Sequence, residues 1–121
     1  MELRLEAVSR SIRSARAWVR LRAGAAPADT VRTAELLTSE LVTNAVKYGP
    51  PKGSITVRAT NESGVLDVSV TDESHRRPVV RDPAPSEVGG RGLLMVDALA
   101  SDWGVRLHQG DGKSVWFRLR H

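Results

Sequence analysis

Three polar side chains that could contact one ligand follow each other along a single predicted helix. Glu40, Asn44 and Lys47 lie in the stretch SELVTNAVKYGPP, at spacings of four and then three residues. At about 100° per residue they fall within an arc of roughly 60°, beside an apolar arc that includes Leu37 and Leu41. An amide oxygen suits Mg²⁺, an amine suits phosphate, and a carboxylate can accept a proton from a hydroxyl. The alternative is a half-exposed stripe on the rim of the buried face, which stabilises the helix by about 0.2–0.5 kcal/mol per pair.

A carboxylate at the end of a predicted strand is the second candidate group. Leu66, Val68 and Val70 alternate with polar residues and should face the core, and Asp72 has the same parity. An inward carboxylate is costly unless hydrogen-bond donors surround it. A local turn or a helix cap could supply those donors, and so could the exocyclic amino group of a purine.

A glycine-rich stretch, Gly89-Gly90-Arg91-Gly92-Leu93, opens a predicted helix over residues 92–100. Glycines let backbone N–H groups approach an anion, and a helix N-terminus adds a favourable partial charge. The alternative is a simple tight turn. The stretch is not a Walker loop, because no Gly-Lys-Ser/Thr ending follows, and it lacks the setting of a dinucleotide fingerprint. With the helix and the strand end, it indicates a nucleotide site.

The elements that would position these residues can be predicted from hydrophobic periodicity. Alternation predicts a short strand over residues 2–6, and helical spacing of apolar residues predicts a helix over about 8–22. A second helix over about 29–48 should be capped by Asp29. Gly49 suits the left-handed position after that helix, and two prolines prevent its continuation.

The rest of the chain predicts strands with one helix among them. SITVRAT and VLDVSVT indicate a β-hairpin around the turn 61–64, and residues 73–89 form a proline-punctuated loop. DWGVRLHQ and KSVWFRL indicate two further strands around the turn 110–112, with Val105 and Leu107 packing on the last strand. This order predicts an α+β fold: a two-layer sandwich with a mixed, mostly antiparallel sheet and its helices on one face.

The composition indicates one soluble domain covering residues 1–121, with 40% hydrophobic and 26% charged residues. The sequence has no cysteine, which excludes disulfides and thiolate metal sites. Neither an apolar run long enough to cross a bilayer nor a signal peptide is present. We therefore expect a cytoplasmic protein that has no membrane partner.

The charge is basic, with a formal net charge of +4 and a sequence pI of about 10.3. Such a chain can attract nucleic acid or an acidic protein. Arg13, Arg16 and Arg20 share the polar face of the first helix, which is either a solvated face or a docking surface for an acidic partner. Nucleic acid is the minor alternative, because zinc-finger spacing and an aromatic-rich strand are both missing.

Three motifs together resemble those of one superfamily. ELVTNAVKYG is similar to the N-box of the GHKL ATPases, VTDES to their first glycine box and GGRGL to their second. The short form of the chain, with SELVTNAV and the ending DWGV followed by GKSVWF, most resembles the anti-sigma-factor serine/threonine kinase branch, and similar stand-alone proteins are abundant in actinobacteria. The resemblance runs from about Val8 to Leu119. One departure is Ser74, which stands where the first glycine box usually has glycine.

The resemblance implies a Bergerat-type ATP-binding fold and a role for each candidate residue. It implies Asn44 as the ligand of Mg²⁺, Glu40 as the general base and Lys47 as a phosphate contact. Asp72 would accept a hydrogen bond from the adenine amine. The segment that would close over the β- and γ-phosphates of ATP comprises Gly90, the backbone at Arg91, Gly92 and Leu93.

The resemblance also implies an activity and partners. The leading hypothesis is an ATP-dependent serine/threonine kinase that phosphorylates an anti-anti-sigma-type antagonist and otherwise sequesters a sigma factor. The alternative is a nucleotide-dependent regulator that binds its partner without phosphotransfer. Kinases of this branch are often dimers, so a homodimer remains open.

Overall fold

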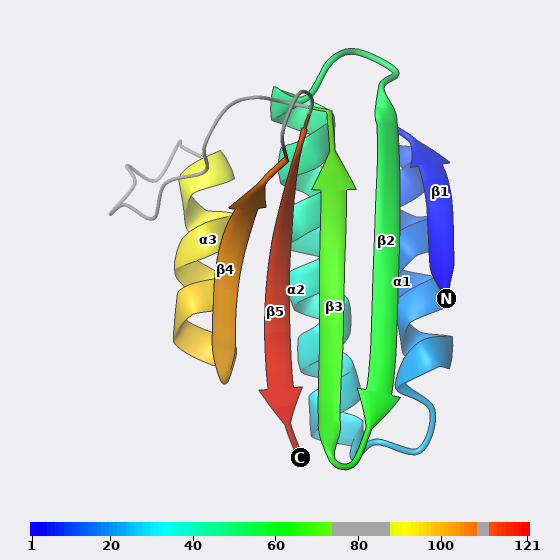
Figure 1. The fold of residues 1–121 in the computed structure, drawn as a ribbon, viewed down its shortest axis with the longest axis vertical. Coiled ribbons are helices and arrows are strands. Elements are labelled where there is room, and N and C mark those ends of the chain that lie inside the picture. The colour runs from blue at the N-terminus through cyan, green and yellow to red at the C-terminus, as the bar shows by residue number, and fades with distance from the viewer. Residues whose placement is uncertain (74–87, 109–111) are drawn as a thin grey trace.

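The computed structural model describes residues 1–73, 88–108 and 112–121. Within these residues a five-stranded sheet is covered on one face by three helices (Figure 1). The elements in chain order are β1 (Glu2–Glu6), α1 (Arg10–Ala23), α2 (Ala28–Tyr48), β2 (Ser54–Glu62), β3 (Val65–Asp72), α3 (Val88–Leu99), β4 (Asp102–Leu107) and β5 (Lys113–Arg120). This order and the two layers confirm the α+β sandwich predicted from the sequence.

The sheet has the strand order β1-β2-β3-β5-β4, and every neighbouring pair is antiparallel. β5 lies between β3 and β4, so it separates the two strands that α3 connects. A parallel contact between β3 and β4 is thereby avoided, and the sheet predicted as mixed and mostly antiparallel is antiparallel throughout the described strands.

The β2–β3 hairpin is tighter than the sequence predicted. Asn61 and Glu62 continue β2, and the turn consists of Ser63 and Gly64, whose φ angles are +52° and +76°. Two consecutive positive φ angles are typical of a type I′ turn, whose twist matches that of the paired strands. Asn61 Nδ2 also donates a hydrogen bond of 2.7 Å to the carbonyl oxygen of Ala23, which ties the hairpin to the end of α1.

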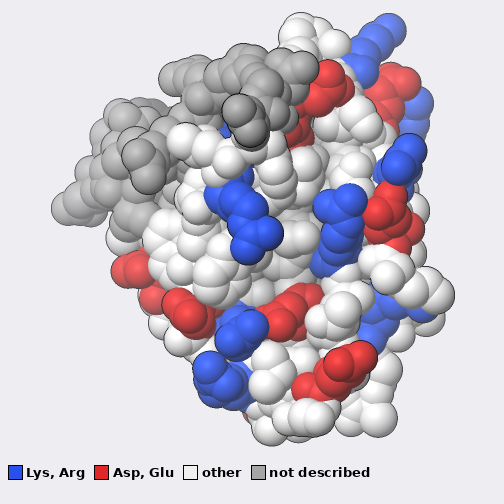
Figure 2. All heavy atoms as spheres, in the orientation of Figure 1, with Lys and Arg blue, Asp and Glu red and all other residues white. Residues whose placement is uncertain are grey.

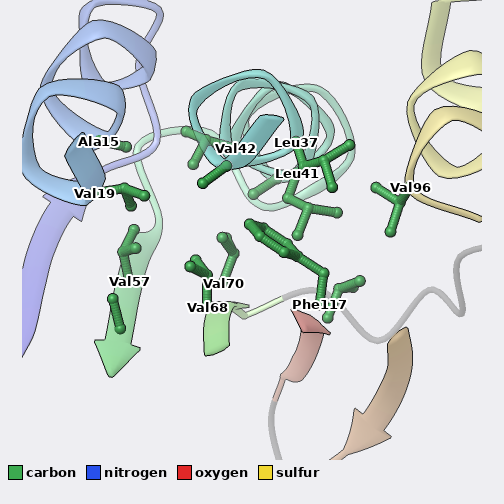
Figure 3. Packing of buried hydrophobic residues seen from close by; sticks show 14 of the residues in the cluster. Ala15, Val19, Leu37, Leu41, Val42, Val57, Val68, Val70, Val96 and Phe117 are labelled. Atoms are coloured by element: carbon green, nitrogen blue, oxygen red, sulfur yellow. The ribbon is translucent and has the colours of Figure 1, made fainter. Parts of the chain in front are cut away.

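The core lies between the sheet and the helices (Figure 3). Its centre is Phe117 of β5, which is fully buried and points toward α2. The predicted inward residues of the hairpin are all buried there: Ile55, Val57, Leu66, Val68 and Val70. Apolar residues of the three helices close the core from the other side: Ala15 and Val19 of α1, Leu37, Leu41 and Val42 of α2, and Leu93 and Val96 of α3.

Three local predictions were wrong. Pro27 rather than Asp29 precedes α2, and Asp29 lies in the first turn, where it pairs with Arg32. Gly49 is extended, with φ −83° and ψ 173°, so the chain leaves α2 without a left-handed residue at that position. Leu107 is 51% exposed, and it is the last residue of the edge strand β4.

The sheet face away from the helices is polar, and basic and acidic side chains are interspersed across it (Figure 2). Arg118 donates to both carboxylate oxygens of Asp67, and these hydrogen bonds raise the pKa of Arg118. Arg4 and Arg58 both pair with Glu2, and the hydrogen bond from Arg4 lowers the pKa of Glu2. Among the described residues, no helix is long and apolar enough to cross a membrane.

Gly112 is expected to be the least replaceable glycine at the end of the sheet where β3 stops. Its φ is +89°, and a Cβ atom there would lie 2.3 Å from the carbonyl oxygen of Asp72. We expect Gly112→Ala to lower the free energy of unfolding, measured in urea, by about 1–3 kcal/mol. Gly24→Ala is the matched control, because Gly24 also has a positive φ but a Cβ atom there would meet its nearest neighbour at 4.0 Å. Equal losses in the two variants would show that the close approach to Asp72 costs nothing.

Candidate functional site

The predicted polar stripe of α2 lies on the rim of the buried face, as expected. Leu41 and Ala45 are buried, Glu40 and Asn44 are half-buried, and Lys47 near the helix end is exposed. Glu40 and Asn44 thus lie on the border between the buried and the solvent-exposed faces of α2. A ligand next to this rim could reach the acid and the amide together.

The polar side-chain atoms of Glu40, Asn44 and Lys47 make no hydrogen bond or ion pair with any of the described residues. Neighbouring polar side chains on the same helix behave differently. Ser39 donates to the carbonyl oxygen of Glu35 at 3.0 Å, and Thr43 donates to that of Ser39 at 2.6 Å. Glu40, Asn44 and Lys47 therefore have hydrogen-bonding capacity that the helix itself does not use.

Asp72 faces inward at the end of β3, where it pairs with a lysine that was not among the predicted site residues. Lys113, directly opposite on β5, places Nζ 3.1 Å from Oδ1 and 3.0 Å from Oδ2 of Asp72. Both side chains are only 7% exposed. Lys113 has the same strand parity as Val115 and Phe117, so its inward direction could have been read from the sequence. Its pairing with Asp72 could not.

Other contacts fix the ends of these strands. On the outer face, the hydroxyl oxygens of Thr71 and Ser114 lie 2.5 Å apart, and Ser114 Oγ is 2.7 Å from His108 Nε2. Next to Asp72, the carboxylate of Glu73 accepts a 2.5 Å hydrogen bond from the backbone N–H of Ser54. The ion pair is thus held by contacts on either side of it.

The glycine-rich stretch, residues 89–93, lies inside α3 instead of before it. α3 begins at Val88, four residues before the predicted start, so Gly90 lies in its first turn and Gly92 in its second. First-turn N–H groups have no partner within a helix, which leaves the backbone at Gly90 suited to an anion. Leu93, 2% exposed, packs into the core. This packing overrides the low helix propensity of glycine.

The elements that carry these residues meet at one end of the molecule. The C-terminal end of α2, the end of β3, the beginning of β5 and the beginning of α3 all lie at the top of Figure 1. α2 packs against both β3 and α3. The structure thus gathers at one end the three segments from which the sequence predicted a site. Ser74 and the rest of the segment 74–87, for which the sequence predicts a loop, lie outside the described residues.

The amide oxygen of Asn44 suits a metal ion that binds together with a nucleotide. Mg²⁺ prefers oxygen ligands and is commonly bound through one or two protein groups together with phosphates and water. The described residues include no cluster of three or more His, Cys, Asp or Glu side chains that could hold a metal. An amide oxygen on a half-buried rim can supply one ligand, and a nucleotide would have to supply most of the others.

A separate hollow of about 530 Å³ lies between α1 and the N-terminal half of α2. Arg13, Arg16, Arg20 and Glu35 line it together with shorter side chains, and Arg20 lies 3.8 Å from Glu35. It contains none of the candidate site residues. The basic stripe predicted on the first helix is therefore exposed beside a hollow of its own.

The fold and the site together define an α+β domain of the nucleotide-binding type, with its polar groups at one end of an antiparallel sheet. Residues 1–119 match the family model of the histidine kinase-like ATPase domain. The chain belongs to this family, which places it in the GHKL superfamily.

Solved structures agree with this assignment. The histidine kinase domain of the blue-light activated histidine kinase EL346 of Erythrobacter litoralis is similar at a TM-score of 0.57 and 27% identity. The match covers 78% of this chain and 46% of that domain, so the chain spans about half the length of this relative. The mycobacterial sensor histidine kinase MprB shares the fold at a TM-score of 0.53 and 15% identity, over 98% of this chain and 97% of that chain. No curated protein matches the chain.

Proposed function

We propose that this GHKL-type domain binds Mg-ATP and acts as an anti-sigma factor with serine/threonine kinase activity toward an anti-anti-sigma-type antagonist. The observation that carries the proposal is the stripe of Glu40, Asn44 and Lys47 on α2. It is free of hydrogen bonds to the described residues and lies at the same end of the fold as inward-facing Asp72. A histidine kinase-like ATPase fold gives this arrangement a nucleotide as its natural ligand.

Each side chain has one task in this proposal. Asp72 accepts a hydrogen bond from the base, Lys47 contacts phosphate, and Asn44 ligates Mg²⁺, which neutralises phosphate charge. Backbone N–H groups at the beginning of α3, from Gly90 to Arg91, face the phosphates, and Gly92 and Leu93 anchor this segment next to them. Mg-ATP supplies the phosphoryl group, and the protein supplies position and charge.

The transfer step needs a base at the attacking hydroxyl. The serine or threonine oxygen of the antagonist forms a bond to the γ-phosphorus, the bond from that phosphorus to the β–γ bridging oxygen breaks, and ADP leaves. The carboxylate of Glu40 accepts the proton of the hydroxyl. Its half-buried position on the rim, one turn before Asn44, suits a group that must reach both nucleotide and protein substrate.

The partners in this proposal are a sigma factor and its antagonist, and the proposed location is the cytoplasm. Support for this branch comes from the motif SELVTNAV and from the ending DWGV with GKSVWF. The exposed arginines beside the hollow of α1 offer a surface for an acidic segment of such a partner. Whether a homodimer forms can be measured by light scattering with and without Mg-ATP.

Glu40→Gln separates phosphotransfer from binding. We expect Mg-ATP affinity within about threefold of the wild type, because the amide keeps the shape and the hydrogen-bonding capacity of the side chain. Transfer of label from γ-³²P-ATP to an antagonist protein should fall by about 10²–10⁴, the usual contribution of a positioned base.

Glu35→Gln is the matched control on the same helix. Glu35 lies outside the candidate site, near Arg20, so its variant should retain Mg-ATP binding. The variant removes a negative charge and keeps the arginines of the hollow, so docking of an acidic partner segment and label transfer should not fall. Full phosphotransfer by Glu40→Gln would rule out Glu40 as the base. Suppose that the wild type binds Mg-ATP tightly but transfers no label. The protein would then be a regulator that binds its partner without phosphotransfer, and the kinase proposal would be wrong.

A further inference from the structure

The last inward pair of the ladder between β3 and β5 differs from the pairs before it. Those pairs are apolar: Leu66 with Leu119, Val68 with Phe117, and Val70 with Val115. Asp72 and Lys113 end the ladder with an ion pair in which each side chain is 7% exposed. Burying two charges carries a desolvation penalty that a well-packed apolar pair would avoid. Packing alone therefore does not account for the two charges.

The ion pair engages the carboxylate group of Asp72 from the neighbouring strand. Lys113 Nζ lies 3.1 Å from Oδ1 and 3.0 Å from Oδ2, so one ammonium group contacts both acceptor atoms. Asp72 also takes part in a further interaction. The backbone of Gly112 approaches the carbonyl oxygen of Asp72 closely, which limits how far the two strands can shift. Asp72 is thus an acceptor that already has its partners, not an open one.

A nucleotide base needs the same two oxygen atoms. Asp72 is proposed to accept a hydrogen bond from the amine of adenine, and this bond uses a lone pair of Oδ1 or Oδ2. The amine and the ammonium are both donors, so their N–H groups repel each other when they point at one carboxylate. Because the two side chains are only 7% exposed, a base reaches the oxygens only when the ammonium moves aside. A lysine can do this without a change in the strand, because its ammonium is a point charge on a flexible stem.

We propose that Lys113 and the base of the nucleotide compete for the carboxylate of Asp72, so that the ion pair is an autoinhibitory contact that lowers nucleotide affinity. The inference rests on the proposed nucleotide-binding function and names a regulation of that same site. Lys113 does not contact the nucleotide in this proposal. It acts through Asp72, because the free energy of the ion pair opposes binding of the base.

Lys113→Met provides the first test, because it removes the ammonium and keeps a side chain of similar length. A closed contact that leaves about one tenth of the molecules competent weakens binding about tenfold. The dissociation constant of Mg-ATP, measured by calorimetry, should therefore fall about tenfold in the variant. A fall of less than about threefold, or a rise, overturns the inference and leaves the proposed function intact. Absence of binding by both proteins overturns the proposed function and the inference with it.

The stability of the same variant should change in the opposite direction to its affinity. Removing one partner of a buried ion pair leaves the other charge uncompensated, so Lys113→Met without nucleotide should unfold at a lower urea concentration than the wild type. Saturating Mg-ATP should narrow this difference in unfolding midpoint, because a ligand at a given concentration stabilises the tighter binder more. A difference that Mg-ATP leaves unchanged would show that the ion pair and the base do not compete.

An ATP analogue without the amine identifies the group that competes. Purine riboside triphosphate carries hydrogen in place of the 6-amino group, so it has no donor to offer at that position. A hydrogen bond to an open charged acceptor contributes more than about tenfold in affinity. In the wild type the amine must displace the ammonium, so ATP should bind less than about tenfold more tightly than the analogue, whereas in Lys113→Met the ratio should exceed about tenfold.

The wild-type ratio decides the inference even if Lys113→Met does not fold. A wild-type ratio above about tenfold would show that the amine already gains a full hydrogen bond, which overturns the competition. If Lys113→Met changes the affinity for ATP and for the analogue by one factor, its effect does not involve the amine, and that result also contradicts the inference.

Two control variants separate the charge of Lys113 from other effects. Lys113→Arg keeps a cation opposite Asp72, so its dissociation constant for Mg-ATP should stay within about threefold of the wild type. A gain like that of Lys113→Met would overturn the role of the charge. Lys47→Met removes an amine from the proposed phosphate contact on α2. It should weaken ATP and the analogue by the same factor, because both carry the same triphosphate, and a changed ratio would overturn the assignment to Lys113.

Discussion

Asn44→Ala is expected to weaken Mg-ATP binding by at least about a hundredfold, equivalent to about 2.7 kcal/mol. The amide oxygen of Asn44 is the proposed ligand of Mg²⁺, and alanine supplies no replacement. Calorimetry with and without Mg²⁺ should show that the wild type gains affinity from the metal and that the variant does not.

The same variant should fold normally. Asn44 is half-buried, makes no side-chain hydrogen bond to the described residues, and lies within a helix in which alanine is the better helix former. We expect unfolding in urea to be unchanged or shifted to slightly higher denaturant concentration. Thr43→Ala, one position earlier, removes a hydroxyl that the helix already uses and should leave binding unchanged. If Asn44→Ala binds Mg-ATP like the wild type, the assignment of the site to α2 is wrong.

Phe117→Ala is expected to cause the largest loss of stability, about 3–5 kcal/mol. Phe117 is fully buried and is the largest of the fully buried side chains in the described part of the chain. It points from the centre of β5 toward α2 (Figure 3), so its removal leaves a cavity between the sheet and the helix that carries the site. The total free energy of unfolding of a small domain is about 5–15 kcal/mol, so the variant should be close to unfolding at ordinary temperature.

Chemical denaturation followed by circular dichroism measures this loss. Leu107→Ala is the control, since Leu107 is 51% exposed at the end of the edge strand and should cost less than about 1 kcal/mol. Saturating Mg-ATP should restore part of the stability of Phe117→Ala, because a ligand that binds the folded state favours it by mass action. A loss below about 1 kcal/mol would contradict the position of Phe117 at the centre of the core.

Much of the fold could be predicted because its signals are local. Alternation in β2 and β3 determines which side chains face inward, and this parity alone predicts that Asp72 lies in the interior, where it is found. Helical spacing likewise predicts Glu40 and Asn44 on the rim of the buried face of α2. The roles assigned to these residues stay predictions until nucleotide binding is measured.

Features that depend on packing were predicted less well. The beginning of α3 was placed four residues late, because its glycines favour a loop locally while Leu93 and Val96 anchor the helix in the core. Gly49 was expected in the left-handed region on the basis of its residue type, yet the chain is extended there as it turns toward β2. At the beginning of α3, a tertiary contact thus outweighs a local preference.

The sequence by itself determined which residues face inward and which polar groups share a helix face, because side-chain direction repeats every two residues in a strand and every 3.6 in a helix. The tertiary structure decided which of those groups meet. Asp72 and Lys113 are 41 residues apart, and their contact depends on β5 pairing with β3 in one register. Strand order and register are set by the packing of the whole sheet against its helices. The packing of the whole core therefore determines that Asp72 lies opposite Lys113.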